Sequence, residues 1–166
     1  MYTERKLKIV LIDDDPQMRE MLNDFLKGRF PESQIDEFAT GEHALLSIAN
    51  AQPDVIILDY HLDSADPAAM NGIQVLRKIK DYHEDVPVIF LTSQDKTEIA
   101  ANTMKYGAWD YILKNEHAFN RLEIIINNII GHTDLRKNLG TQKFFNRLLA
   151  VLLVALVIGF IIIRLT

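Results

Sequence analysis

Short apolar runs recur along the first 131 residues and are separated by longer amphipathic stretches. The runs at residues 8–12 (KIVLI), 55–58 (VIIL) and 86–91 (VPVIFL) do not alternate with polar residues. Such runs are typical of strands that are buried on both faces of a parallel sheet. A weaker alternating segment at residues 33–38 and a short run at residues 111–113 predict two further strands.

Helical periodicity fills the gaps between these strands. Asp15 followed by Pro16 predicts an N-cap with proline at the first helical position. The remaining helices are predicted at residues 41–50, 72–82, 96–106 and 118–130, the last one ending at Gly131. Strands that alternate with helices predict an α/β fold, with a five-stranded parallel sheet covered by helices on both faces.

The carboxyl-terminal end has a different character. Residues 148–163 carry no polar side chain and are apolar on every face, which excludes an amphipathic surface or interfacial helix. Extended to residues 144–165, the segment has 22 residues and a helical length of about 33 Å. We predict a transmembrane helix over residues 144–165. The alternative is a hydrophobic helix that is buried or that associates with itself.

The charges that flank this segment predict its orientation. Four basic residues precede the apolar run at residues 148–163 (Arg136, Lys137, Lys143 and Arg147), and only Arg164 follows this run. Because the more basic flank stays on the cytoplasmic side, we predict a single-pass protein of the cytoplasmic (inner) membrane. Its α/β domain faces the cytoplasm, and the polar residues 132–143 form the linker.

Composition excludes several kinds of function. The net charge is −5, but residues 136–166 hold five of the 18 basic residues and no acid, so the rest has 13 basic residues against 23 acids. A part with a charge of −10 does not favour nucleic acid as a partner. The absence of cysteine excludes a disulfide framework, a cysteine nucleophile and a thiolate metal site.

Reactive side chains follow the predicted strands. Asp13 and Asp14 follow the first strand, Asp59 the third, Thr92 the fourth and Lys114 the fifth. Ligands of open parallel sheets bind at this edge. Clustered carboxylates favour a hard divalent cation such as Mg²⁺, and a carboxylate can also act as a nucleophile toward a phosphoryl group. Alone, an aspartate after a strand is more typical of a helix N-cap, and Asp15 fits that role best. Thr92 alone is more typical of a turn or cap, and Lys114 alone of a solvated surface charge.

Five segments in order resemble the receiver domain of bacterial two-component response regulators: IVLIDDDPQMREML (9–22), DVIILDYHL (54–62), MNGIQVLRKI (70–79), VPVIFLTS (86–93) and GAWDYILK (107–114). The resemblance covers residues 5–131 and implies the flavodoxin-like, doubly wound sheet of that family. It implies that Mg²⁺ is held by Asp14 and Asp59, by Asp13 through bound water, and by the backbone carbonyl of His61.

The same resemblance implies the chemistry of the site. Asp59 would be the phosphoacceptor, Thr92 would bond a phosphoryl oxygen, and Lys114 would pair with the phosphoryl group. Tyr111 matches the aromatic switch position of the family. The resemblance further implies a histidine kinase or a phosphotransfer protein as the phosphodonor, and a downstream protein partner. It implies no enzymatic activity beyond assistance to the domain's own phosphorylation and dephosphorylation.

Two departures from the family pattern affect the site. Asn115 stands where the family usually has proline after the lysine, so the turn around Lys114 is expected to differ. Residues 63–69 (DSADPAA) form an insertion beside the site, about five residues longer than usual for the family. The plainest interpretation of this insertion is a tolerated surface loop.

The favoured hypothesis is a membrane-anchored, stand-alone receiver that signals by changed protein binding. The departures at Asn115 and residues 63–69 motivate an alternative, a receiver-like scaffold that does not depend on phosphorylation. A phosphatase that uses an aspartyl phosphate is disfavoured, because it needs an acid at position 61, where this chain has histidine.

Overall fold

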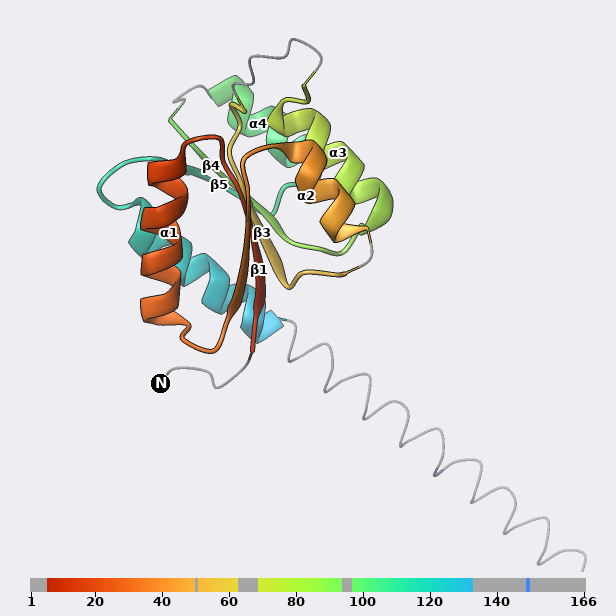
Figure 1. Ribbon diagram of the computed structural model, residues 1–166. Helices are drawn as coiled ribbons and strands as arrows, with labels where there is room; N and C mark the ends of the chain where they lie inside the picture. The colour runs from red at the N-terminus through yellow and green to blue at the C-terminus, as the bar shows by residue number, and fades with distance from the viewer. Residues whose placement is uncertain (1–5, 50, 63–68, 94–96, 133–148, 150–166) are drawn as a thin grey trace, which may run out of the picture. The chain divides into compact units, whose positions relative to one another are not determined.

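The sheet has five parallel strands in the order β2-β1-β3-β4-β5 (Figure 1). The computed structural model describes residues 6–49, 51–62, 69–93, 97–132 and 149. The strands are β1 Lys8–Ile12, β2 Gln34–Phe38, β3 Val55–Leu58, β4 Val88–Thr92 and β5 Asp110–Leu113. The register pairs Ile12 with Leu58 and Thr92 with Leu113, so neighbouring strands end close to the same level.

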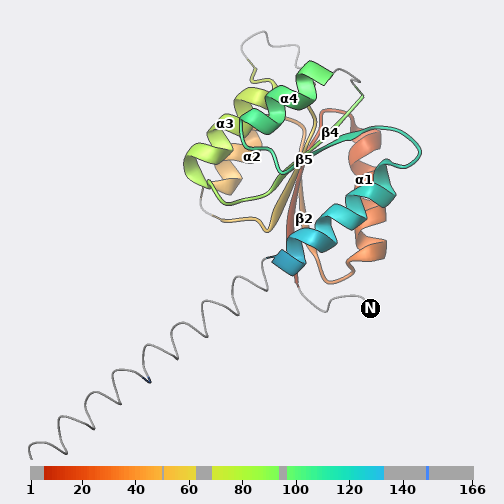
Figure 2. The same ribbon diagram turned by 180° about the vertical axis from the view of Figure 1, so that it is seen from behind.

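Helices cover both faces of this sheet. They are α1 Pro16–Arg29, α2 Gly41–Ile48, α3 Gly72–Tyr82, α4 Thr97–Lys105 and a helix at residues 118–132. Figures 1 and 2 show α1 and the start of the 118–132 helix on one face and α2, α3 and α4 on the other. The α/β fold predicted from the alternation of strands and helices is confirmed, and so is the flavodoxin-like topology that the family resemblance implied.

The apolar runs form the centre of the molecule. Every residue of β3 and β4 is buried, and β1 is buried from Ile9 onward. One half of the core packs alternate strand side chains such as Val10, Ile56 and Phe90 against the apolar faces of α2 and α3. The continuous hydrophobicity of these strands follows from this burial on two faces.

Polar side chains fix the starts of two helices near the site. The Asp15 carboxylate accepts a hydrogen bond from the backbone N–H of Gln17, and Pro16 begins α1, as predicted. Asn71 forms a capping box with Gln74 at the start of α3, which satisfies two backbone N–H groups that no helical bond reaches.

Several predicted boundaries were wrong by a few residues. β4 begins at Val88 rather than residue 86, since Pro87 has no N–H to donate, although its carbonyl accepts from Ile56 N at 3.0 Å. The last helix does not end at Gly131 but continues through His132. A Cβ atom added at Gly131 would have no other atom within 4 Å. A glycine inside a helix costs only about 1 kcal/mol relative to alanine, so the helix can continue past it.

The chain divides into two units, Met1–Ile126 and Asn127–Thr166. Of the second unit, the structure describes residues 127–132 and Leu149. The predicted linker beyond His132 and the predicted span at residues 144–165 lie outside the described residues, apart from Leu149. Among the described residues, no helix combines the length and the apolar character that a membrane crossing requires. Most of the insertion, residues 63–68, also lies outside them.

Candidate acidic site at the carboxyl edge of the sheet

Backbone hydrogen bonds carry the sheet one residue past the ends of its strands. Asp13 N donates to Phe38 O (3.1 Å), Asp59 N to Ile12 O (2.8 Å) and Lys114 N to Thr92 O (2.8 Å). These bonds fix the Cα positions of Asp13, Asp59 and Lys114 at the same edge. The side chains that follow the apolar runs in the sequence therefore converge on one place.

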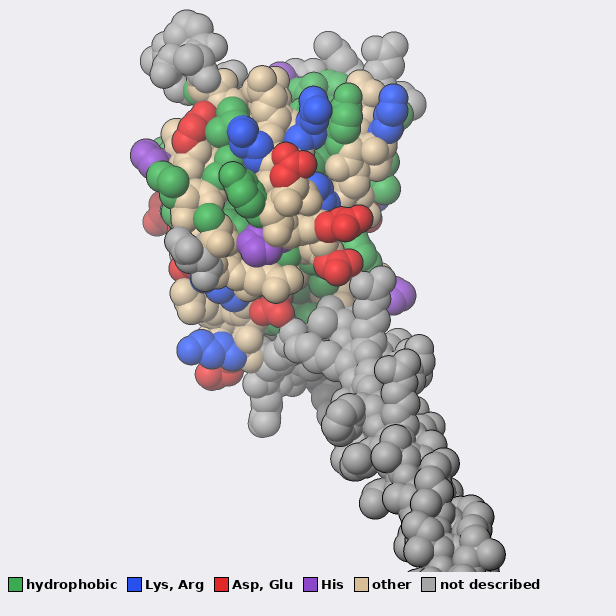
Figure 3. Space-filling view, turned by 90° about the vertical axis from the view of Figure 1, so that its right-hand side faces the viewer, with side chains coloured by type: hydrophobic (Ala, Val, Ile, Leu, Met, Phe, Trp, Pro, Cys, Tyr) green, Lys and Arg blue, Asp and Glu red, His purple; other side chains and the backbone are tan. Residues whose placement is uncertain are grey.

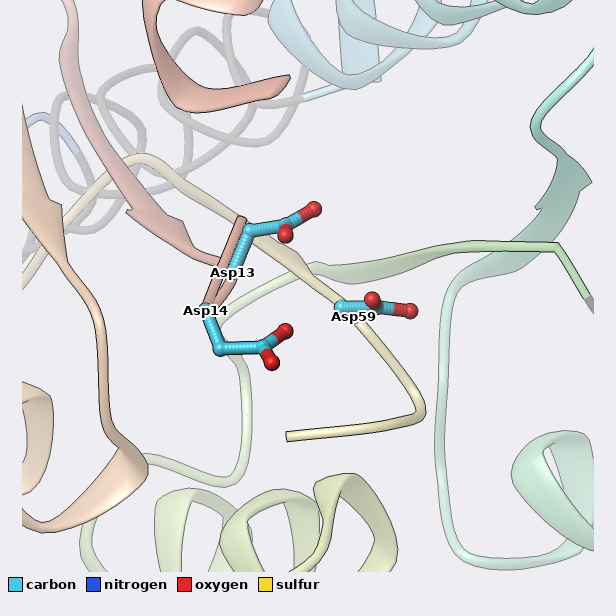
Figure 4. Close-up of side chains that lie close together, drawn as sticks. All are labelled: Asp13, Asp14 and Asp59. Carbon is cyan, nitrogen blue, oxygen red and sulfur yellow. The ribbon is translucent and has the colours of Figure 1, made fainter. Parts of the chain in front are cut away.

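Three carboxylates meet at this edge. One carboxylate oxygen from each of Asp13, Asp14 and Asp59 lies within 4.8 Å of the others, and Figure 4 shows the three side chains next to one another at the ends of β1 and β3. Asp13 is 3% exposed and Asp59 6% exposed, while Asp14 is half-buried. Like charges at this separation repel one another unless a cation lies between them.

Lys114 supplies one such cation. Its Nζ atom donates to Asp13 Oδ2 at 2.7 Å and to Asp59 Oδ2 at 2.8 Å, so one ammonium bridges two carboxylates. The side chain of Lys114 is largely buried, which strengthens both ion pairs because little water screens them. The predicted convergence of the residues after β1, β3 and β5 is found.

Burial and these ion pairs shift two pKa values. Burial raises the pKa of Asp13, and the hydrogen bond and charge of Lys114 oppose that shift without cancelling it. Burial alone would lower the pKa of Lys114, but the hydrogen bonds to Asp13 and Asp59 and the negative charges of these two residues together outweigh burial and leave the pKa raised. Lys114 therefore stays charged at neutral pH, since the ordinary lysine value is already far above 7.

The donor set fits a divalent cation of the Mg²⁺ type. With all groups ionised, three carboxylates and one ammonium leave two negative charges that no described side chain of the cluster balances. Carboxylate oxygens are the ligands that hard divalent cations prefer. Asp13, Asp14 and Asp59 are the residues that would hold such an ion, and the His61 carbonyl is the backbone candidate.

The other predicted site residues surround this cluster. Thr92 is fully buried at the end of β4. The backbone N–H of His61 donates to Asp59 Oδ1 at a long 3.4 Å. Nε2 of His61 is buried without a hydrogen-bond partner among the described residues. Tyr111 is partly buried against the α2–α3 side of the core, and its strand partner is Phe90, two residues before Thr92.

The turn after Lys114 forms without the family's proline. The described residues contain no cis peptide bond, and Asn115 N donates to Leu113 O at 2.9 Å. The asparagine side chain accepts from His117 N at 3.0 Å, which orders the same turn. With asparagine in this position, Lys114 still reaches both carboxylates.

Two residues near the site were not predicted. A guanidinium N–H of Arg19 donates to the backbone carbonyl of Asp13 and so holds the turn that carries the acidic pair. Gly72 approaches Asp59 so closely that a Cβ atom would lie 2.4 Å from the Asp59 carbonyl oxygen. In the sequence, Arg19 is only one polar residue of a predicted helix, and Gly72 is only part of a segment that resembles the family. Neither position carries a signal that would mark it as part of the site.

Fold and site together define an α/β domain with an acidic, lysine-bridged site at the carboxyl edge of a parallel sheet. The chain belongs to the response regulator receiver domain family, whose model matches residues 9–127. The predicted resemblance is thereby confirmed for the receiver domain.

Curated relatives share this domain with the chain but are longer. The response regulator DctR of Halalkalibacterium halodurans is 28% identical over 123 residues, covering 74% of this chain and 51% of the relative. The regulatory protein LuxO of Vibrio cholerae is 35% identical over 104 residues, covering 63% of this chain and 22% of the relative. The chain thus spans about half or less of the length of these relatives.

A solved structure agrees with the domain as a whole. A response regulator receiver domain protein from Clostridium thermocellum is 27% identical, with a TM-score of 0.67. The alignment covers 78% of this chain and 98% of that protein. Nearly the entire neighbour is therefore matched by the part of this chain that holds the sheet and the acidic site.

Proposed function

We propose that this protein is a membrane-anchored receiver of a two-component phosphorelay and that it accepts a phosphoryl group on Asp59. The observation that carries the proposal is the Asp59 carboxylate, held by Lys114 at 2.8 Å beside Asp13 and Asp14. The donor is a histidine kinase or a phosphotransfer protein, and the output is a change in binding to another protein.

The side chains suit this transfer. A carboxylate oxygen of Asp59 bonds to phosphorus as the P–N bond of the donor's phosphohistidine breaks, and the electron pair returns to the imidazole nitrogen, which takes up a proton. Lys114 can follow the negative charge from Asp59 Oδ2 to a phosphoryl oxygen. Thr92, at the end of the adjacent β4, can donate a hydrogen bond from its hydroxyl group to a second phosphoryl oxygen. Bound Mg²⁺ supplies the positive charge that the phosphoryl oxygens need.

The resulting charge changes the packing around the strand ends. Phosphorylation turns the singly charged Asp59 carboxylate into an acyl phosphate with up to two negative charges, so it adds about one negative charge and three strong acceptor oxygens at a largely buried position. Thr92 and Tyr111 lie on β4 and β5, the two strands through which this change reaches α4 and the 118–132 helix. The expected output is a switch between two packings of this face.

Phosphorylation of the purified full-length chain tests the proposal directly. Acetyl phosphate with Mg²⁺ should add the mass of one phosphoryl group to the intact protein, and Asp59→Asn should abolish the addition. The scaffold alternative rests on Asn115 and the insertion, and it would be favoured if wild type and Asp59→Asn both remained unmodified.

Membrane anchoring is part of the same proposal and rests on residues 144–165. Their sixteen-residue apolar centre and the basic residues before it support a single span with the receiver domain in the cytoplasm. Such a tether raises the local concentration of the domain near membrane-bound kinases.

A further inference from the structure

The segment between β3 and α3 leaves and re-enters the fold next to Asp59. Gly72 N donates to Tyr60 O at 3.1 Å, so the two ends of this segment meet directly beside the acidic cluster. The segment includes residues 63–69, which the resemblance to the family marked as an insertion. A longer loop loses more conformational entropy when its ends are held together, although the increase with length is gradual.

A carboxylate from a different element holds the returning end. Glu42, in the first turn of α2, accepts a hydrogen bond from Met70 N at 2.7 Å. A hydrogen bond to a charged acceptor is stronger than one between neutral groups, and both residues are half-buried. Glu42 is thus the described side chain that joins α2 to the chain just before α3.

Glu42 also lies close to the acidic cluster. Together with Asp14, Leu62 and Met70 it lines a pocket of about 180 Å³ between the β2–α2 turn and the β3–α3 segment. The outgoing end of that segment carries His61, whose N–H points to Asp59 Oδ1. The outgoing end of the segment therefore contacts Asp59, and the returning end lines a pocket together with Asp14.

We propose that Glu42 is a positioning residue. It fixes the β3–α3 segment against α2 and so holds the His61 backbone and the Asp59 carboxylate in place for a divalent cation. This inference rests on the proposed function, and no separate catalytic role is assigned to Glu42. The other described restraints on the two ends of the segment are the Gly72–Tyr60 hydrogen bond and the packing of Leu62 and Met70 against the core.

Three variants of the full-length chain separate this role from others. Glu42→Ala removes both the hydrogen bond and a negative charge near Asp14, whereas Glu42→Gln removes the charge but keeps an acceptor oxygen. Asn71 follows Met70 directly, and Asn71→Ala breaks the capping box of α3 while leaving the Glu42 side chain in place. It therefore controls for general destabilisation of α3.

Mg²⁺ affinity, measured by calorimetry, is the first readout. Glu42→Ala should weaken Mg²⁺ binding about tenfold. This is the lower end of the losses that follow removal of residues that orient metal ligands. Glu42→Gln should recover most of that loss, and Asn71→Ala should lower the melting temperature without changing the affinity. If Gln weakens binding as much as Ala, Glu42 acts through its charge and the inference is wrong. Equal loss in Asn71→Ala would overturn it as well.

Amide hydrogen exchange without Mg²⁺ is the second readout and does not depend on phosphorylation. Glu42→Ala should accelerate exchange at the Met70 and His61 amides by at least about tenfold, with little change in β1 or β3. Unchanged exchange at His61 would refute the positioning role. If wild type binds no Mg²⁺, the proposed function fails, while exchange at His61 still decides the inference about Glu42.

Discussion

Gly72 is the residue at which α3 comes closest to the proposed phosphoacceptor. A Cβ atom at this position would lie 2.4 Å from the Asp59 carbonyl oxygen and 2.9 Å from Tyr60 Cα. Both atoms belong to the backbone of the segment that carries the site, so neither can move aside by a rotamer change. The side chain is absent here because the helix start and the strand end share the same space.

Gly72→Ala should therefore displace Asp59. We expect the free energy of unfolding to fall by about 1–3 kcal/mol, as for other overpacked positions, and phosphorylation by acetyl phosphate to slow. Gly28→Ala is the matched control, because nothing lies within 4 Å of its Cβ position in α1. The control should gain up to about 1 kcal/mol of stability. Chemical denaturation and intact-mass kinetics measure both effects, and normal phosphorylation of Gly72→Ala would contradict the argument.

In the proposed function, Lys114 links phosphorylation of Asp59 to the conformational change, because it already bridges Asp13 and Asp59. Lys114→Ala should still permit phosphorylation of Asp59, because the nucleophile and the other carboxylates remain. The variant should lose most of the conformational response, because no ammonium group is then present to form an ion pair with the phosphoryl group on Asp59. Two-dimensional NMR of β4 and β5 amides, with and without beryllium fluoride, would measure this response. A response as large as that of wild type would exclude the assigned role.

The third aspartate after β1 belongs to a helix rather than to the cation site. Asp15 caps α1 through Gln17 N, while the backbone N–H of Asp15 donates to Asp13 Oδ1 at 3.0 Å. Only the first of these bonds uses its side chain. Three consecutive aspartates in the sequence thus serve two different purposes.

Asp15→Ala should lower the free energy of unfolding by about 1 kcal/mol through loss of the cap. Mg²⁺ affinity should stay within about twofold of wild type, whereas Asp14→Ala should lose most binding. Asp15→Ser should restore stability, since serine caps helices as well. Thermal unfolding and calorimetry provide the measurements, and a loss of Mg²⁺ binding in Asp15→Ala would place Asp15 in the site.

The end of α3 carries a half-buried lysine, Lys80. Lys80 Nζ donates to Glu84 O (2.9 Å) and Val86 O (2.7 Å), which ties α3 to the segment entering β4. Burial lowers the pKa of Lys80, and the nearby charges of Asp85 and Glu84 oppose this shift only in part.

The unfolded chain binds this proton more tightly than the folded protein does. Stability contributed by Lys80 should therefore rise with pH in the window just below the ordinary lysine value of 10.5. The free energy of unfolding of wild type and of Lys80→Met can be measured by denaturation at several pH values from 7 to 10.5. Relative to the variant, wild type should become more stable as the pH rises. A difference that shifts the other way would mean that the lysine is stabilised in its charged form.

At the scale of the whole molecule, the described face of α2 and α3 mixes apolar and charged side chains. Figure 3 shows the side of α2 and α3, where hydrophobic side chains lie among charged ones. The most exposed of the large apolar side chains are Leu46 (73%) on α2 and Tyr82 (63%) at the end of α3. Single exposed apolar residues of this kind are normal. The proposed membrane anchor therefore rests on the sequence of the apolar segment at residues 148–163.

Deletion of residues 144–166 should move the protein from the membrane fraction to the supernatant. Leu156→Arg, at the centre of the apolar run, should weaken insertion by about 3 kcal/mol, while Leu156→Ala should leave it nearly unchanged. Carbonate extraction of membranes followed by immunoblotting measures the distribution. Recovery of the full-length chain in the supernatant would contradict the anchor.

Sequence alone determined the class of fold and the main site. The runs at β1, β3 and β4 are apolar because those strands are buried on both faces, and a parallel sheet brings their ends to one edge. Asp13, Asp59 and Lys114 could be predicted there because each directly follows a run. A local pattern is enough when function sits next to such a strong hydrophobic signal.

Tertiary structure alone decided how the site is held. The contacts of Glu42 with Met70 and of Gly72 with Asp59 join segments whose spacing depends on how α2 and α3 pack on the sheet. Neither residue belongs to an apolar run that would mark its place. The helix also continues past Gly131, because a single glycine weakens a helix by only about 1 kcal/mol and does not by itself end it.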